Sequence, residues 1–545
     1  MPEIVTPRVP DNQADRLPDG TSVGALRAAD GHPRVRTVCY PTPRIPAASN
    51  TPTRHLMHSP RSCCLTACLL LAIPSPARAQ VPHGYQTDFT AAEFAARRAK
   101  LYDAIGARSI AVVQGASGVP GFSVFRQSND FYYLSGIESA HAYLLLNGRT
   151  RTATLYLPPR DEGAERSGGK ILSAEDSALV KQLTGVDQVR GVESLARDLV
   201  SADLIRPPAL ALFTPLSPME TGNDSRDELL AGQARAASDP WDGRPSREAH
   251  FVRLVRERFP QFEVRDLSPA LDSLRVIKSA AEIALIRKAT QLAGLGIMEA
   301  MRSTSPDVYE YQLDAAAKYV FYVNGARGDG YASIIGGGTN AYLGHYFRKA
   351  DALRTGDLVL MDYAPDYRYY TSDVTRIWPV NGKFTAAQAA LYEYIVAYRD
   401  ALFRYIRPGV TADQVLDSAA ADMKQYLVGK TFASPVHLKA VQQGLAFRGH
   451  FQHPVGMAVH DVGRVRGVPL RPGMVFTIDP MIWIHEERLY IRIEDMALVT
   501  ADGVENLSGF VPSRIADVER TIGEAGVIQF RPPTTPSRES GPNRK

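Results

Sequence analysis

Two pairs of β-rich segments in the last third of the chain set strict limits on its fold. The first pair, residues 358–362 and 369–380, is separated by turn-forming residues and therefore predicts a hairpin. The second pair, residues 474–483 and 489–500, flanks a polar turn and predicts another hairpin. A hairpin folds two stretches of sequence back on each other, so acidic residues that are well separated in the chain can lie side by side.

Both predicted hairpins carry carboxylates, and the segment between them carries a histidine. Hard or borderline divalent cations prefer oxygen donors with a minority of imidazole, and two neighbouring ions need several carboxylates to offset their charge. On the last strand Arg492 and Glu494 share one face, because side chains alternate along a strand, so we expect Arg492 to contact Glu494. The pattern predicts metal-assisted hydrolysis. The predicted metal ligands are Asp362, Asp373, His453, Asp479 and Glu494.

Several sequence blocks resemble those of one enzyme superfamily in order and spacing. They are YASIIGGGTNAYLGHY (331–346), LMD followed by SDVTR, HPVGMAVHDVG (453–463), RPGMVFTIDP and IRIED. These blocks resemble the "pita-bread" metallopeptidases and, within that superfamily, the aminopeptidase P and prolidase branch. The stretch FSVFRQSNDFYYLSG (122–136) is similar to the amino-terminal domain of that branch, and the whole resemblance covers residues 88–520.

The resemblance implies an α/β (α+β) fold, in which an amino-terminal α/β domain precedes a pita-bread catalytic domain with an internal pseudo-duplication. We place the amino-terminal domain at residues 85–265, the catalytic domain at 270–525 and a disordered tail at 526–545. In the first domain we expect a helix at 90–106, strands at 109–115, 130–136, 141–148 and 152–158, and a long loop or insertion at 215–247. In the second we expect a strand-like lead and a long helix within 273–301, and helices at 308–324, 386–406 and 412–427.

Position by position, the resemblance implies that Asp362, Asp373, His453 and Glu494 are metal ligands. Asp479 stands where the family usually has a glutamate, and its side chain is one methylene shorter. We therefore expect Asp479 to bind one ion, while the general-base role of the family glutamate stays an open question at this position.

Other residues match the catalytic machinery of the family. His345 and His460 correspond to its two active-site histidines that do not bind metal, and we group Arg492 with them as catalytic. The candidates for substrate binding are His450, Val459 and Trp483. His450 lies one position later than the histidine that close relatives often carry, and core packing is the alternative role for Trp483.

The implied reaction is hydrolysis of the bond between an amino-terminal residue and a following proline. Two divalent cations, expected to be manganese with zinc or cobalt as alternatives, would hold a water whose lowered pKa supplies the attacking hydroxide. The alternatives are a prolidase-type Xaa-Pro dipeptidase and a metal-depleted pita-bread protein that acts as a binding module. The expected partners are peptides with proline in the second position and further copies of the chain, in a homo-oligomeric dimer or tetramer.

The front of the chain predicts where the protein works. From Met57 a short basic start leads into an apolar run, Cys63–Ile73, and then into a small-x-small motif that ends at Ala79. This pattern is typical of a signal peptide at residues 57–79, and its apolar run is too short to span a bilayer. We expect a secreted or periplasmic protein after cleavage near Ala79, with residues 1–56 a non-native or disordered extension.

Charge and cysteine content change at the same point. The first 79 residues hold nine Lys or Arg and five Asp or Glu, which leaves 53 basic and 53 acidic residues in the remainder. A neutral mature chain gives no indication of binding to nucleic acid or to an anionic membrane. All four cysteines precede Gln80, so we expect no disulfide in the mature chain. Its 466 residues suffice for two good-sized domains.

Overall fold

The computed structural model describes residues 85–119, 121, 123–201, 211–222 and 224–530. The expected extension at 1–56 and the expected signal peptide at 57–79 lie outside these residues. The described residues belong to one compact unit. Within them, no helix has the length and apolar character needed to cross a membrane.

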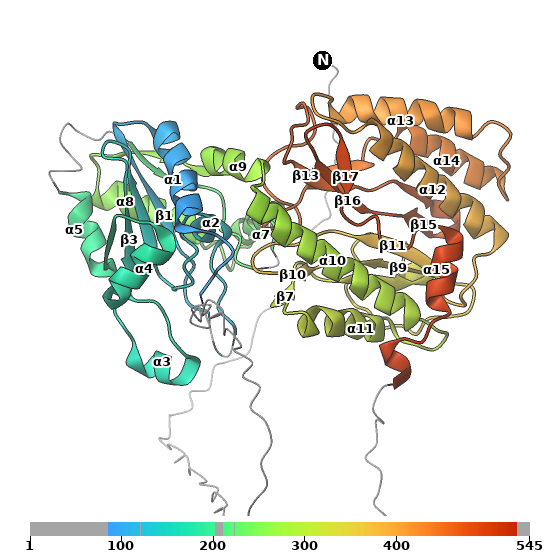
Figure 1. Ribbon diagram of the computed structural model, residues 1–545, viewed down its shortest axis with the longest axis horizontal. Helices are drawn as coiled ribbons and strands as arrows, with labels where there is room; N and C mark the ends of the chain where they lie inside the picture. The colour runs from blue at the N-terminus through green and yellow to red at the C-terminus, as the bar shows by residue number, and fades with distance from the viewer. Residues whose placement is uncertain (1–84, 120, 122, 202–210, 223, 531–545) are drawn as a thin grey trace, which may run out of the picture. The chain divides into compact units, whose positions relative to one another are not determined.

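The amino-terminal part contains a six-stranded sheet accompanied by helices (Figure 1). The strand order is β4-β3-β2-β1-β5-β6, in which β1–β2 and β2–β3 are antiparallel and the other pairs are parallel. The strands are β1 (Ser109–Gln114), β2 (Tyr143–Asn147), β3 (Thr152–Leu157), β4 (Gln188–Gly191), β5 (Ala211–Thr214) and β6 (Glu263–Asp266). The helices are α1 (Ala91–Ile105), α2 (Asn129–Ser135), α3 (Glu162–Gly168), α4 (Ser177–Thr184), α5 (Leu195–Leu199), α7 (Arg226–Ser238) and α8 (Arg247–Arg258).

The aromatic run at 130–136 is helical, so the predicted strand there is wrong. It forms most of α2, whose residues are all buried, and Gly136 ends the helix with a φ of 66°. Aromatic residues favour strands, but that preference depends on context, and burial on all sides of this segment overrode it. A Cβ at Gly136 would lie 2.5 Å from the Phe94 ring, so both the backbone and the packing require glycine.

The segment 215–247 is also more ordered than the predicted loop, because it contains α7. Ser225 and Glu228 form a capping box at the start of this helix. None of the α7 residues is buried, so the helix carries no continuous apolar stripe that would have predicted it. The capping signature is therefore its main local signal.

The lead into the long helix of the second domain is helical rather than strand-like. It is the end of α9 (Ser268–Val276), and α10 (Ala280–Arg302) follows after a capping box at Ser279. The other helices of this part are α11 (Glu310–Val323), α12 (Ala386–Tyr405), α13 (Ala412–Tyr426), α14 (Pro435–Ala446) and α15 (Ile515–Ile522). The three helices predicted at 308–324, 386–406 and 412–427 are confirmed as α11, α12 and α13.

Short antiparallel strands make up the sheets of this second part. They form a three-stranded sheet in the order β11-β9-β8, a four-stranded sheet in the order β12-β13-β16-β17, and the pairs β14–β15 and β10–β7. The strands are β7 (Gly328–Asp329), β8 (Ile334–Gly337), β9 (Leu358–Asp362), β10 (Pro365–Asp366), β11 (Thr375–Pro379), β12 (Phe451–Pro454), β13 (Val475–Ile478), β14 (Met481–Ile484), β15 (Leu489–Arg492), β16 (Asp495–Val499) and β17 (Val504–Asn506). The predicted mixed α/β fold is confirmed.

Both predicted hairpins are present, each with a change. The first pairs β9 with β11, but its connection is longer than a tight turn and includes β10, which pairs with β7. The second is one long hairpin in two parts, β13–β16 and β14–β15, with the predicted polar turn between β14 and β15. The interruption between its parts falls at residues 479–480 and 493–494. Two of the predicted metal ligands therefore leave the regular ladder at that point.

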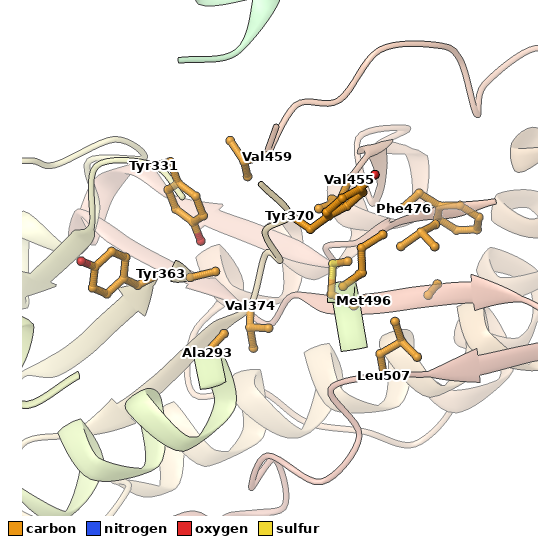
Figure 2. Close-up of a cluster of buried hydrophobic side chains, with 14 of the residues drawn as sticks. Ala293, Tyr331, Tyr363, Tyr370, Val374, Val455, Val459, Phe476, Met496 and Leu507 are labelled. Carbon is orange, nitrogen blue, oxygen red and sulfur yellow. The ribbon is translucent and has the colours of Figure 1, made fainter. Parts of the chain in front are cut away.

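Apolar side chains from both sheets and from α10 pack into a continuous core around the hairpins. Figure 2 shows a part of it, in which Val374, Val455, Phe476 and Met496 are each fully buried. Such packing fixes the strands that carry the polar residues. Beyond the expected domain end at 525, a short 3₁₀ helix at Val527–Phe530 extends the fold, and the rest of the expected tail lies outside the described residues.

Candidate active site

Carboxylates from the two hairpins meet where their sheets join. Asp362 ends β9 and lies opposite Thr375, the first residue of β11. Thr375 forms a β-bridge with Glu494 and its hydroxyl donates to Glu494 Oε2 at 3.0 Å. Asp373 lies two residues before β11. The start of β11 therefore links the acidic residues of both hairpins.

Three of the predicted ligands are placed to share one metal ion. Asp373, His453 and Glu494 each offer a ligand atom, and these atoms all lie within 4.8 Å of one another. His453 Nε2 is 3.5 Å from Asp373 Oδ2, while its Nδ1 lies 3.2 Å from the Pro454 carbonyl oxygen. Two carboxylates and one imidazole form a donor set that suits a divalent cation.

Arg492 contacts the other two predicted ligands. Its Nη2 donates to Asp362 Oδ2 and, at 2.6 Å, to Glu494 Oε2, which confirms the predicted contact between Arg492 and Glu494. Its Nε lies 3.4 Å from Asp479 Oδ1. A planar guanidinium with several donors can hold three carboxylates in fixed positions at once. Arg492 therefore organises the acidic residues that approach it from separate strands.

The buried charge of the site is unbalanced. Four carboxylates, those of Asp362, Asp373, Asp479 and Glu494, gather around one guanidinium and are all nearly inaccessible to solvent. Burial raises the pKa of Asp373, Asp479 and Glu494, and neighbouring carboxylates raise it further. Burial lowers the pKa of His453 to about 3, so its ring is neutral, as a metal ligand must be. Divalent cations suit this excess of negative charge.

Asp479 provides a second indication that the site fits metal. Its Oδ1 is buried and accepts no hydrogen bond from the described residues, although it forms an ion pair with Arg492, whose Nε lies 3.4 Å away. Its Oδ2 accepts from Gln452 Nε2 at 3.4 Å. A buried carboxylate oxygen without a hydrogen bond is unfavourable, and a cation would satisfy it. The shorter aspartate is therefore compatible with metal binding.

Tyr331 is a site residue that the sequence did not single out. Its hydroxyl contacts Asp362 Oδ1 and lies 2.9 Å from Asp373 Oδ1. The ring is buried, and burial with the adjacent carboxylates raises the pKa of Tyr331 well above its usual value. Tyr331 is thus a neutral group that lies against both aspartates and donates its single hydrogen to one of them at a time. It precedes them by 31 and 42 positions, and although it opens the block at 331–346, nothing in that block marks it as a contact of the aspartates.

A cavity of about 1030 Å³ opens over these groups. Its lining includes all five predicted ligands and, among the other predicted residues, His345, Val459, His460, Trp483 and Arg492. Trp483 stacks on Tyr490 with ring centroids 4.8 Å apart and meets Phe447 edge-on. These rings form an aromatic wall beside the carboxylates. The exposed His345 lies near Phe347 on another part of the lining.

His450 lies behind the cavity, and its position contradicts the predicted contact with substrate. The ring is fully buried, and its Nε2 lies 2.7 Å from the Gly444 carbonyl oxygen. The Met481 backbone N–H donates to its Nδ1 at 3.2 Å. Because both ring nitrogens bind backbone groups, His450 is a packing residue that supports β14.

His460 is held by α7, the helix that the sequence did not predict. Its Nδ1 lies 2.8 Å from Asp227 Oδ2, and its backbone N–H donates to Ser225 Oγ at 3.1 Å. The ring also lies against His453, with centroids 4.2 Å apart. The contact between His460 and Asp227 joins residues 233 positions apart. The capping box at the start of α7 is the one sequence signal near it.

The chain is similar to two sequence families over adjacent stretches. A sequence model described as metallopeptidase family M24 matches residues 284–501, and one described as the aminopeptidase P N-terminal domain matches residues 94–203. Residues 204–283 lie between the two matches.

Curated relatives match most of the chain. A Xaa-Pro aminopeptidase of Haemophilus influenzae is 31% identical over 415 residues, which cover 73% of this chain and 88% of the relative. The human Xaa-Pro aminopeptidase 3 is 30% identical over 424 residues, which cover 74% of this chain and 77% of the relative.

Solved structures show the same fold. Aminopeptidase P from E. coli with the inhibitor Pro-Leu matches with a TM-score of 0.64 and 26% identity, over 82% of this chain and all of that one. Proline aminopeptidase P II from Yersinia pestis matches with a TM-score of 0.64 and 29% identity, over 80% of this chain and all of that one.

Proposed function

Since this chain belongs to metallopeptidase family M24, in the aminopeptidase P branch, we propose that it releases the amino-terminal residue from peptides with proline in the second position. It is a hydrolase of the metallopeptidase class. The observation that carries the proposal is the group of four buried carboxylates and one half-buried histidine beneath a cavity of about 1030 Å³.

The residues that would hold the cofactor are the five predicted ligands, with Asp373, His453 and Glu494 already within chelating distance of one another. Divalent cations bound there would lower the pKa of a water and polarise the scissile carbonyl. We propose two ions, because four carboxylates exceed what one cation would neutralise. Manganese suits the oxygen-rich set, and zinc or cobalt are the alternatives to test.

The protein's own groups then have separate tasks. Arg492 and Tyr331 keep the carboxylates in position from either side. Asp479 is a buried carboxylate of the cavity lining, and we assign it the task of accepting the proton of the attacking water and passing it to the leaving nitrogen. His460 faces the oxygen of the reacting carbonyl and His345 orients the peptide, both from the cavity lining.

The cavity wall explains how a proline could be accepted. A peptide bond to proline has no N–H, so recognition has to come from shape and from apolar contact with the ring. Val459 and Trp483 supply apolar surface beside the carboxylates, and Trp483 is fixed by its stacking on Tyr490. We propose that the pyrrolidine ring lies against this wall.

The extent of the cavity favours an aminopeptidase over a dipeptidase. Its lining runs from the carboxylates to one face of α7, where Leu229, Gly232, Gln233 and Ala236 lie. A dipeptide does not need that space, because two residues span only about 7 Å in an extended chain. The face of α7 would accommodate the residues that follow proline.

The deciding experiment compares Xaa-Pro dipeptides with Xaa-Pro tetrapeptides, using purified protein with and without added Mn²⁺ and with chelator. We expect cleavage of both lengths after the first residue, faster for the tetrapeptides, and no activity with chelator. Activity on dipeptides alone would make the protein a prolidase-type enzyme. Failure to bind metal or to cleave any peptide would favour the binding-module alternative.

We further propose that the chain is exported and that residues 57–79 direct it. The support is the basic start, apolar run and small-residue motif of that segment. Amino-terminal sequencing of the protein from a periplasmic or culture fraction should begin near Gln80. Recovery of the uncleaved chain from the cytoplasm alone would refute the export proposal. Whether the chain forms a homo-oligomer is a separate prediction, to be tested by light scattering.

A further inference from the structure

Helix α7 lies against the cavity although it belongs to the amino-terminal part of the chain. Glu228, Leu229, Gly232, Gln233 and Ala236 from one face of the helix line the cavity. Because none of the residues of α7 is buried, its packing on the core does not explain where it lies. The contacts at its amino-terminal end explain its position.

Three consecutive residues at the start of α7 attach it to the rest of the molecule. Ser225 accepts a hydrogen bond from the His460 backbone N–H at 3.1 Å. Arg226 Nη1 donates to Asp272 Oδ1 at 2.6 Å. Asp227 Oδ2 lies 2.8 Å from His460 Nδ1. The helix therefore contacts both the backbone and the ring of His460.

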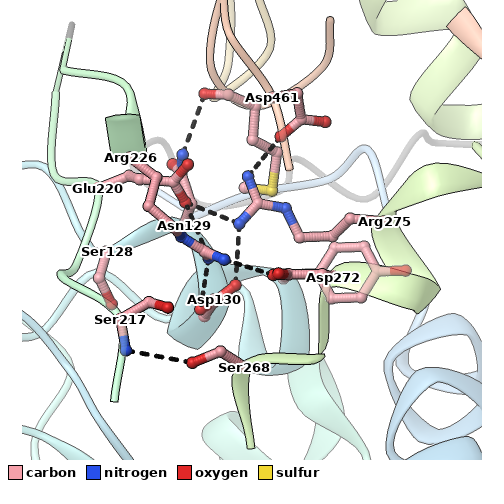
Figure 3. Close-up of polar contacts among 12 residues, drawn as sticks. Ser128, Asn129, Asp130, Ser217, Glu220, Arg226, Ser268, Asp272, Arg275 and Asp461 are labelled. Carbon is pink, nitrogen blue, oxygen red and sulfur yellow. Dashed lines mark hydrogen bonds and ion pairs between the residues drawn. The ribbon is translucent and has the colours of Figure 1, made fainter. Parts of the chain in front are cut away.

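A buried ion cluster holds Asp461, the residue that follows His460 (Figure 3). Arg275 donates to Asp461 Oδ1 at 2.6 Å, to Glu220 Oε2 at 2.8 Å and to Asp130 Oδ1 at 2.9 Å, and Lys278 lies 3.1 Å from Asp461 Oδ2. Arg226 of α7 also lies within 3.7 Å of Glu220. Breaking a buried pair of this kind is strongly unfavourable, so the backbone around position 461 is rigid.

The ring of His460 still needs its own restraint. A fixed backbone leaves the two side-chain torsions free, and a ring at the wall of a cavity can rotate. Among the described residues, Asp227 is the group that the structure pairs with a ring nitrogen of His460. A carboxylate accepts, so Nδ1 carries a hydrogen and Nε2 is the nitrogen left for the cavity.

We propose that Asp227 is a positioning residue of the active site, which fixes the His460 ring so that Nε2 faces the reacting peptide. The role rests on the proposed function, in which His460 acts on the scissile carbonyl. Asp227 itself is not among the residues that line the cavity, so it acts through His460 and has no direct contact with substrate. The proposal gives α7 a function that its exposed composition does not suggest.

Exposure of Asp227 makes this role separable from a structural one. Its side chain is 61% accessible, so solvent screens the pair and its contribution to folding is small. We therefore expect Asp227→Ala to leave the urea midpoint and the metal content unchanged. Loss of a group that orients an active-site histidine lowers activity by about 10-fold or more.

The test compares Asp227→Ala, Asp227→Asn and the matched control Asp239→Ala, all in the full-length metal-loaded protein. Asp239 follows the last residue of the same helix, is exposed and lies away from the cavity. We expect Asp227→Ala to lower kcat on an Xaa-Pro tetrapeptide about 10-fold with KM nearly unchanged. Asp227→Asn keeps an acceptor oxygen and should restore most of kcat, and Asp239→Ala should match the wild type.

Wild-type kcat in Asp227→Ala, or equal losses in the alanine and asparagine variants, would overturn the proposal. A second measurement needs no activity: in the metal-free protein labelled with ¹⁵N-histidine, the Nδ1–H signal of His460 should be present in the wild type and absent in Asp227→Ala. If the wild type cleaves no Xaa-Pro peptide, the proposed function fails while this spectrum still tests the pair. An unchanged spectrum in Asp227→Ala would refute the pairing itself.

Discussion

His450 should make the stability of this protein depend on pH in a way that a single substitution removes. Its Nε2 lies 2.7 Å from the Gly444 carbonyl oxygen, and its Nδ1 accepts from the Met481 N–H at 3.2 Å. Only the neutral ring, with its hydrogen on Nε2, satisfies both contacts. A second proton would place a donor on Nδ1 against the N–H of Met481. Burial accordingly lowers the pKa of His450 to about 4.

The sign and size of the effect follow from that pKa. In the unfolded chain histidine titrates near its ordinary value of about 6.5, so below that pH the unfolded state binds a proton that the folded state refuses. The contribution of His450 to the free energy of unfolding is therefore fully present above pH 6.5, and it is lost as the pH falls towards 4. Each pH unit removes about 1.4 kcal/mol, which gives about 2 kcal/mol between pH 6.5 and pH 5.

The substitution His450→Asn isolates the contribution that the titration of His450 makes to stability. The carboxamide oxygen can replace Nδ1 as the acceptor for Met481, but asparagine does not titrate and does not reach Gly444. At pH 8 we expect the variant to be less stable by about 1–3 kcal/mol, because a buried carbonyl loses its partner. At pH 5 the difference should shrink by about 2 kcal/mol, since only the wild type carries the proton penalty.

The assay is urea unfolding of the chelator-treated proteins at pH 8, 7, 6 and 5, followed by far-UV circular dichroism. His453 and the carboxylates are common to both proteins, so their own titration cancels in the difference. A stability difference that stays constant over this range would refute the argument. A variant that loses peptide cleavage at pH 8 while staying folded would restore His450 as a substrate contact.

Further predictions concern the site and the cavity. Asp479→Glu should keep its metal and at least preserve turnover, and metal loss by elemental analysis would show a pocket built around aspartate. Tyr331→Phe removes the hydroxyl between Asp362 and Asp373 and should weaken metal binding about 10-fold or more in a metal titration; unchanged affinity would contradict its proposed task. A Cβ at Gly232 would only touch the end of the Arg235 side chain, 3.9 Å away, so Gly232→Leu fits and should narrow the cavity, which lowers kcat/KM for tetrapeptides but not for dipeptides. Equal effects on both lengths would remove α7 from the substrate site.

Much of the fold could be predicted because its signals are local. The helices α11, α12 and α13 combine apolar periodicity with start signals near their amino-terminal ends, and the two hairpins combine β-rich runs with turn residues. The errors arose where such signals conflict with packing. Aromatic residues suggested a strand at 130–136, but complete burial made that segment the helix α2.

For the candidate site, too, some residues could be predicted from local signals and others could not. Residue chemistry and spacing predicted five metal ligands, and all five residues line one cavity; the alternation along a strand predicted the contact between Arg492 and Glu494. Sequence position failed for His450, because its ring, three residues before a predicted ligand, is buried against Gly444 and Met481 instead of lining the cavity. It missed Tyr331 and Asp227, since neither has a local pattern that ties it to the ligands.

By itself, the sequence determined which residues can act as oxygen-rich donors on the two hairpins. It also determined where several helices begin, through capping residues and apolar periodicity in short segments. The tertiary structure alone decided how these groups are held. It brought Asp227 to His460 across 233 residues, placed Tyr331 between two aspartates, and turned His450 into a packing residue. The physical reason is that periodicity and capping act over a few residues, whereas these contacts depend on how whole elements dock, and docking is set by the complete core.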